Sequence, residues 1–174
     1  MSEKLKLWLG LCEEGVGIDE DEAERASATA EVRKAVAEEV RERYLTARAA
    51  AGTLAVAAGA DAEVCSALVS LDCARTLTAL LESAKPELVH RALVWITEMV
   101  VTYELEGEVT EEERQLQQKD TELRRRCAVH LMEGGVVAAI SVVLQLKDAQ
   151  LGGLARDAAQ ALSKAIGNSG LSEK

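Results

Sequence analysis

The sequence predicts an all-α fold, an armadillo-type right-handed helical solenoid of about three repeats. Two patterns support this expectation, because alanine-rich helical segments recur along the chain and the segments before them recur as well. Composition is a third observation, since 48% of the residues are hydrophobic but only 2% are aromatic. The core must therefore consist mostly of Ala, Leu and Val, whose small and medium side chains suit tightly stacked helices.

The alanine-rich segments share a run of small residues followed by an apolar stripe. They cover Arg48–Ala58, His90–Val100 and Ala155–Ile166. Aligned on Ala50, Ala92 and Ala158, they are separated first by one period and then by one period plus an insertion. A period of about 40 residues is typical of armadillo and HEAT-type repeats, so we expect these three alanines to be buried at helix crossings. The residues one turn later, expected in the same core, are Leu54, Ile96 and Leu162.

A second repeated segment precedes each of the last two alanine-rich helices. Leu68–Ser83 aligns with Leu131–Leu146 at a constant offset and without a gap. The β-branched run Val136–Leu146 resembles a strand, but it follows a Gly-Gly turn and matches a helical segment one repeat earlier, which favours a helix. Lys4–Cys12 is similar to the same segment and would supply the partner of the first alanine-rich helix. No repeat can bury its apolar face alone, so these parts should stack.

The chain is expected to form one domain over residues 1–174, because this length suits a single core. Two acidic stretches interrupt the repeat and are interpreted as insertions, one at about 13–30 and one at about 103–122. The first has carboxylates suited to the start of a following helix, where the helix dipole favours anions. The cluster Arg124–Arg126 is interpreted as part of a solvated helix, with a basic docking spot as the alternative.

Composition and motifs exclude several functions. A net charge of −10 argues against binding to duplex nucleic acid, which depends on neutralising phosphates. The sequence has no run of about 18 apolar residues, as a membrane span would need, and no visible signal peptide, so we expect a cytoplasmic protein. No catalytic group, metal site or cofactor is predicted, because the nucleophile–base pairs, zinc spacings and phosphate-binding loops are absent. The cysteines, expected to be buried thiols, are Cys12, Cys65, Cys73 and Cys127.

Short motifs in a consistent order closely resemble the last repeats of the UCS-domain myosin chaperones. They are Glu3–Leu9, Arg48–Ala55, Cys65, Glu87–Val100, Leu131–Glu133 and Ala155–Ile166. The resemblance covers Glu3 to Asn168 apart from the two acidic stretches. This chain departs from the family at Glu98, where the family tends to have Asn.

The resemblance implies a C-terminal fragment of a longer protein. Its function would be that of a non-enzymatic protein-binding scaffold, part of the domain with which a myosin-folding co-chaperone binds the myosin motor domain. A heat-shock chaperone would be recruited only through domains outside this chain. The alternative is a generic armadillo-repeat adaptor that binds an extended peptide of another partner, because the same groove would serve either function.

The candidate client groove lies on one side of the last two alanine-rich helices. In the first of these, Arg91, Val94 and Glu98 lie on one side, and in the last repeat the matching residues are Asp157, Gln160 and Lys164. The alternative for these six residues is an ordinary solvated face. Trp95 belongs to the same set of candidates, although a partly buried packing role is favoured over a role as ligand anchor. Arg91 could pair with Glu87 one turn earlier, and its planar guanidinium suits carbonyls or carboxylates of a client.

Overall fold

The computed structural model describes residues 6–9, 12, 30–102 and 109–167 of the chain. This part contains helices and no strand, which confirms the all-α prediction. A short helical segment covers residues 6–9. The longer helices are α3 (Ala30–Ala60), α4 (Ala62–Ser70), α5 (Cys73–Leu81), α6 (Pro86–Val100), α7 (Glu111–Glu133), α8 (Val136–Val143) and α9 (Ala149–Gly167).

Local chemistry sets where several helices begin. Pro86 is the first residue of α6, a position where its missing N–H costs nothing. At α7, Thr110 and Glu113 form a capping box in which each side chain binds the backbone N–H of the other residue. The Asp148 carboxylate accepts hydrogen bonds from the backbone N–H groups at positions 150 and 151, at 2.9 and 3.0 Å, and so caps α9.

Two sharp corners lie at equivalent places in the two aligned segments. The chain bends by 89° between α4 and α5 and by 72° between α7 and α8. Each corner has one left-handed residue, Asp72 with φ 56° and Gly135 with φ 83°. The preceding Gly134 packs closely against α5, since a Cβ at this position would collide with the Cβ of Ala74. Both aligned segments therefore contain a helix, a corner and a helix in the same register.

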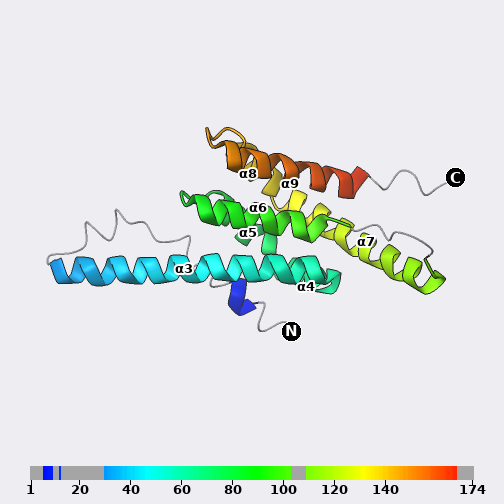
Figure 1. Cartoon of the computed structure of the whole chain (residues 1–174), viewed down its shortest axis with the longest axis horizontal. Coiled ribbons are helices and arrows are strands. Elements are labelled where there is room, and N and C mark those ends of the chain that lie inside the picture. Colours follow the sequence, from blue (N-terminus) through cyan, green and yellow to red (C-terminus); the bar gives the residue numbers. More distant parts are fainter. Residues whose placement is uncertain (1–5, 10–11, 13–29, 103–108, 168–174) are drawn as a thin grey trace.

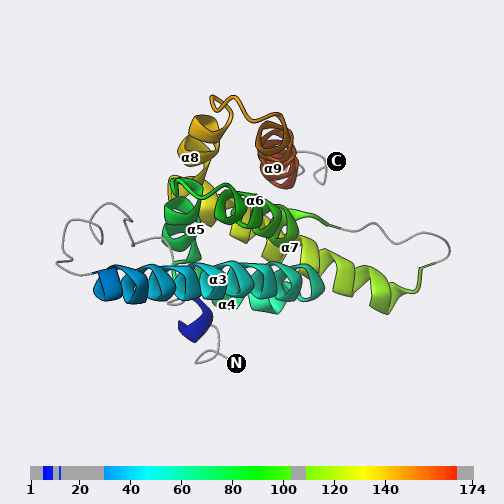
Figure 2. The ribbon, with the colours of Figure 1, turned by 60° about the vertical axis from the view of Figure 1, so that its left-hand side comes forward.

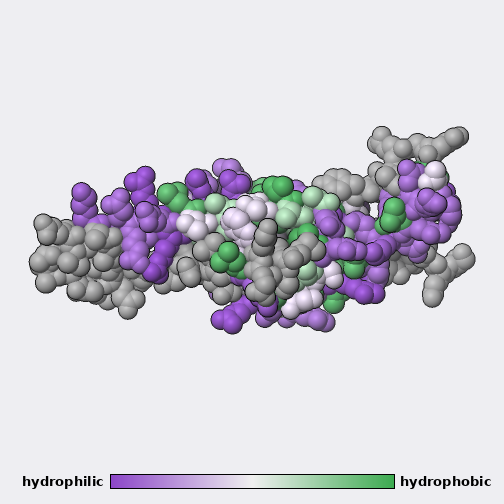
Figure 3. All heavy atoms as spheres, turned by 90° about the horizontal axis from the view of Figure 1, so that it is seen from below, coloured by the Kyte–Doolittle hydropathy of each residue, from purple (hydrophilic) through white to green (hydrophobic). Residues whose placement is uncertain are grey.

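The helices stack in rows. The principal contacts join α3 to α6 and α6 to α9, and parallel contacts join α4 to α7 and α5 to α8. Figures 1 and 2 show α3 and α4 at one end of the stack, α5 and α6 in the middle, and α8 and α9 at the other end. Viewed from below α3 (Figure 3), hydrophobic and neutral residues gather in the middle and hydrophilic residues extend toward the ends.

The core contains the residues that the repeat alignment selected. Ala50, Ala92 and Ala158 are all fully buried. The residues one turn later are buried as well: Leu54, Ile96 and Leu162. The small side chains of the three alanines let α3, α6 and α9 approach one another closely, as expected.

The structure describes the two acidic stretches, predicted as insertions, to different extents. The first, apart from residue 30, lies outside the described residues. In the second, residues 103–108 also lie outside them, but residues 111–122 form the first half of α7. This half is mostly solvent-exposed and extends away from the stack (Figure 1). The second stretch thus lengthens a helix of the stack and does not form a separate element in its described part.

Candidate protein-binding face

The predicted site residues lie on α6 and α9, two neighbouring helices of the row α3–α6–α9. On α6, Arg91, Val94 and Glu98 are half-buried. On α9, the predicted residues are exposed: Asp157, Gln160 and Lys164. The two groups lie on neighbouring helices of the row, but they meet different surroundings.

The two charged residues of α6 lie across α3. The Arg91 Nη1 atom is 3.6 Å from the position that a Cβ on Gly52 would occupy, an ordinary contact. A Cβ on Gly59 would instead collide with the Glu98 carboxylate. These two glycines of α3 therefore leave room for long polar side chains from α6. The expected pair of Arg91 with Glu87 is not among the ion pairs of the described residues.

The three α9 residues meet in a hollow of about 250 Å³ between α6, α7 and α9. Its apolar part includes Val100 and Ala161, and Thr97 of α6 lies beside them. Thr121 and Arg125 of α7 close another side. The hollow thus combines a predominantly apolar lining with hydroxyl, amide, carboxylate and cationic groups. A volume of about 250 Å³ is smaller than that of most small-molecule sites, so the hollow suits a segment of a peptide better.

Arg125, which lines the hollow, also forms an ion pair with Glu122. Its guanidinium donates to both carboxylate oxygens of Glu122, at 2.9 and 3.0 Å. Arg126 also binds Glu122, at 3.1 Å. The hydrogen bonds from Arg125 and Arg126 hold the pKa of Glu122 at about 2, so this carboxylate is charged at neutral pH. Much of the charge of Arg125 is therefore balanced before any ligand arrives.

Trp95 differs from the other candidates. It is fully buried, and its indole N–H has no hydrogen-bond partner in the described part of the chain. Its side chain is a core residue, more completely buried than expected, and cannot touch a client without rearrangement of the stack. Val94 packs at the edge of the same core.

Arg124 has a structural role that its charge hid in the sequence. It is almost fully buried, and its guanidinium binds the backbone carbonyls of Gly59 at 3.1 Å and Glu98 at 2.6 Å. It also reaches the carbonyl of Ala58 at 3.4 Å and the carboxylate of Asp120 at 2.9 Å. Carbonyls near helix C-termini lack partners within the helix, so Arg124 satisfies groups at the ends of both α3 and α6.

A helical stripe could have revealed this role. Arg124 lies on the buried side of α7, one turn before Cys127 and Ala128 and two turns before Leu131. Its two neighbours, Arg125 and Arg126, are more exposed and fit the interpretation as a solvated helix. Extending the apolar stripe of α7 by one turn would have separated the buried arginine from the other two.

The four cysteines are buried, as predicted: Cys12, Cys65, Cys73 and Cys127. Burial is the largest cause that raises the pKa of Cys73, to about 12, so it is a thiol at neutral pH and a poor nucleophile. The thiol of Cys65 donates to the carbonyl of Ala58 at 3.2 Å. These contacts are structural.

Two other features were searched for in the part of the chain that the structure describes: a metal-binding cluster and a single membrane-spanning helix. The described residues contain no group of three or more His, Cys, Asp or Glu side chains placed to hold a metal ion. No single helix within the same ranges is long and apolar enough to cross a membrane.

No family model, no curated protein and no solved structure matches this chain.

Proposed function

We propose that the helices form an armadillo-type right-handed solenoid of about three repeats. One repeat would be α4, α5 and α6, and the next would be α7, α8 and α9, with α3 as the last helix of a preceding repeat. The row contacts support this division, because each helix packs against its equivalent in the next repeat. The two left-handed corner residues, Asp72 and Gly135, support it as well, since they occupy equivalent positions.

The chain would then be a non-enzymatic protein-binding scaffold, with its binding face along α3, α6 and α9. The observation that carries this proposal is the hollow in which Asp157, Gln160 and Lys164 meet. Repeat solenoids typically bind partners along an extended surface of this kind. The resemblance of the sequence to UCS-domain chaperones favours the myosin motor domain as the client. A heat-shock chaperone would take part only through domains that are not in this chain.

The hollow can recognise a polypeptide through several contacts. The amide of Gln160 can both donate to a backbone carbonyl and accept from a backbone N–H. Asp157 and Lys164 are exposed, and neither makes an ion pair with another described residue, so both remain available to charges of opposite sign on a client. The apolar area beside Val100 and Ala161 can receive one small apolar side chain.

The proposal is tested by binding of the chain to a myosin motor domain. The double substitution Gln160→Ala and Lys164→Ala should weaken binding by about tenfold or more, because it removes two polar contacts of roughly 1 kcal/mol each. Ser163→Ala is the matched control, since Ser163 is also exposed on α9 but does not line the hollow. Isothermal titration calorimetry measures both. Absence of binding by the unmodified chain, or equal binding by all variants, would contradict the proposal.

A further inference from the structure

Three buried thiols lie at the contacts among α4, α5 and α7. Cys65 is on α4, Cys73 is the first residue of α5, and Cys127 is on α7. All three are fully or almost fully buried. The fourth cysteine, Cys12, is buried elsewhere, where its thiol donates to the carbonyl of Ala47 on α3 at 3.9 Å. None of the three thiols lines the hollow of the binding face.

One backbone carbonyl joins Cys65 to α7. The Cys65 thiol donates to the carbonyl oxygen of Ala58 at 3.2 Å, and Nη1 of Arg124 donates to the same oxygen at 3.4 Å. Cys127 follows Arg124 by one turn on the buried side of α7. The thiols of Cys65 and Cys127 also form a hydrogen bond with each other. The two cysteines are therefore neighbours across the contact between α4 and α7, although they are far apart in the sequence.

The surroundings make the two thiols of this pair unequal. The hydrogen bond with Cys127 lowers the pKa of Cys65, against the effect of burial, and the guanidinium of Arg124 lowers it further. The same hydrogen bond, together with burial, raises the pKa of Cys127. The thiolate is the nucleophilic form of a cysteine, so Cys65 is the member of the pair that reacts first with an oxidant.

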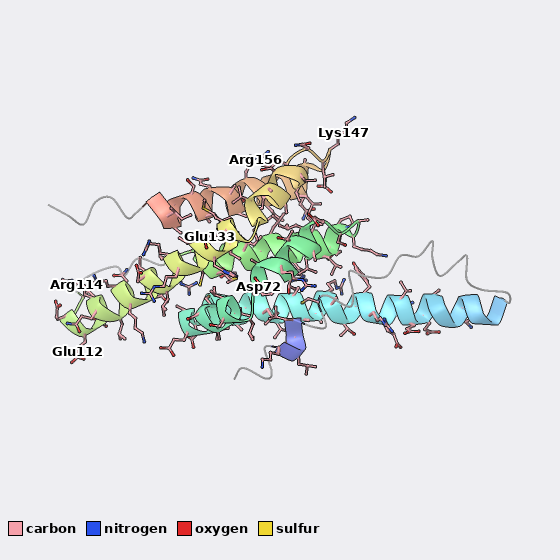
Figure 4. The ribbon with its side chains drawn as sticks, turned by 180° about the vertical axis from the view of Figure 1, so that it is seen from behind. Asp72, Glu112, Arg114, Glu133, Lys147 and Arg156 are labelled. Carbon is pink, nitrogen blue, oxygen red and sulfur yellow. The ribbon has the colours of Figure 1, made fainter. Side chains whose placement is uncertain are left out.

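The contact between α4 and α7 reaches solvent close to the pair. Glu63 is on the same short helix as Cys65, and its carboxylate binds Nζ of Lys119 at 2.7 Å. Both of these side chains are 62% exposed. Figure 4 shows α7 extending beyond the stack to its exposed end, where Glu112 and Arg114 lie. Exposed ion pairs contribute little to stability, so α7 can separate locally from α4 at this edge and admit a small oxidant.

We propose that Cys65 and Cys127 form a redox pair, which hydrogen peroxide converts into a disulfide that clamps α4 to α7. The Cys65 thiolate attacks one peroxide oxygen, the O–O bond breaks, and Cys65 becomes a sulfenic acid while hydroxide leaves and takes up a proton. The Cys127 sulfur then attacks the sulfenic sulfur, so the S–S bond forms and the S–O bond breaks, and the Cys127 proton leaves with the hydroxyl group as water. Two thiols thus lose two electrons to one peroxide molecule, which becomes two molecules of water.

The disulfide fixes a helix that holds the ends of two others. Cys127 is one turn from Arg124, whose guanidinium binds the carbonyls of Gly59 and Glu98, near the ends of α3 and α6. Tying α7 to α4 therefore also limits its separation from α3 and α6. A bond between residues distant in the sequence reduces the conformational freedom of the unfolded chain, which stabilises the folded form. This role is independent of the proposed client.

Peroxide treatment of the reduced, folded chain tests the pairing. Peptide mapping by mass spectrometry should find Cys65 joined to Cys127, and the intact chain should be lighter by two hydrogen atoms. Cys127→Ala should abolish this bond, whereas Cys12→Ala, the matched control, should retain it. Circular dichroism checks that the variants fold, and the map of the unmodified chain decides by itself if Cys127→Ala does not. A chain that stays reduced, a bond from Cys65 to Cys73, or a sulfinic acid at Cys65 beside a reduced Cys127 would overturn the proposal.

Thermal unfolding tests the clamp. The oxidised chain should melt about 5–15 °C higher than the reduced chain, because the disulfide closes a long loop. Dithiothreitol should reverse this increase. Oxidised Cys12→Ala should show the same increase, and peroxide should not raise the melting temperature of Cys127→Ala. An unchanged or lower melting temperature in a chain with the mapped disulfide would show that the bond does not hold α4 against α7, and would overturn the clamp.

Discussion

The contact between α3 and α6 and the contact between α6 and α9 join equivalent helices, but the polar residues of the later helix meet different surroundings in the two contacts. In the first contact, Arg91 and Glu98 of α6 lie across α3, where Gly52 and Gly59 leave room for them. In the second, the polar residues of α9 stand around a hollow of about 250 Å³. We call the first junction closed, because Arg91 and Glu98 of α6 lie against α3, and the second open, because the polar residues of α9 line a hollow.

The residues of the earlier helix differ at the two junctions. The alignment of Ala50 with Ala92 places Val94 and Val101 at the positions of the two α3 glycines. Gly59 lies within α3, whereas Val101 follows the last residue of α6, has an extended backbone and lines the hollow. Asp157 and Lys164, which take the places of Arg91 and Glu98, thus line the hollow beside the end of α6.

The largest expected effect on stability concerns Arg124, which binds backbone carbonyls of both α3 and α6 at the closed junction. Arg124→Ala should lower the free energy of unfolding by about 3 kcal/mol or more, because it removes the guanidinium from the carbonyls of Gly59 and Glu98, near the ends of α3 and α6. Urea denaturation followed by circular dichroism measures the change. Arg126→Ala is the control and should change stability by less than about 0.5 kcal/mol, since its side chain is 68% exposed. Equal effects of the two substitutions would show that the contacts of Arg124 contribute little.

The next effect concerns packing in the middle of the row. Ala92→Leu should cost about 1–3 kcal/mol, because Ala92 is fully buried on α6, which packs against both α3 and α9. Ala49→Leu adds the same atoms on the exposed side of α3 and should be nearly neutral. Thermal unfolding measured by calorimetry compares them. An unchanged melting temperature for Ala92→Leu would mean that the junctions are looser than the burial indicates.

The sequence was sufficient to predict the helical class and much of the stacking. Because burial at a helix crossing demands a small residue in each repeat, the alignment of Ala50, Ala92 and Ala158 selected core positions correctly. The constant offset between the segments that precede the alanine-rich helices also placed the two corners, Asp72 and Gly135, in register. These features are local or periodic, so one sequence contains them.

The remaining features depend on which helices meet. The stripe of α7 indicates on which side Arg124 lies, but its partners are two helix ends 26 and 65 residues away in the chain, which no local pattern encodes. Thr121 and Arg125 were missed as parts of the hollow because α7 has no counterpart in the alignment of alanine-rich helices. The sequence alone does not show that Gly52 and Gly59 lie opposite Arg91 and Glu98, because this depends on how α6 packs against α3.

A smaller effect separates the two glycines of the closed junction. Gly52→Ala should stabilise the chain by about 0.5–1 kcal/mol, because alanine favours the helix and its Cβ would make an ordinary contact with Arg91. Gly59→Ala should lose that gain, since its Cβ would displace the Glu98 carboxylate. Adding Glu98→Ala should restore the gain at Gly59 and not alter the effect at Gly52, with a coupling of roughly 0.5 kcal/mol or more. A double-mutant cycle by urea denaturation measures this coupling, and additive effects at Gly59 would contradict the contact.

The smallest expected effect on stability concerns Arg91, which links the closed junction to the binding face. Arg91→Ala should shift the melting temperature little, because Arg91 makes no ion pair within the described residues and its Nε has no hydrogen-bond partner there. If the proposed client, the myosin motor domain, binds along this row, its binding should nevertheless weaken by about three- to tenfold, since a half-buried guanidinium offers several donors to carbonyls or carboxylates. Arg114→Ala, on the exposed first half of α7, should change neither quantity. If Arg91→Ala instead lowers stability strongly and leaves binding unchanged, the guanidinium belongs to the packing of α6 on α3, and the client would contact only the open junction at α9.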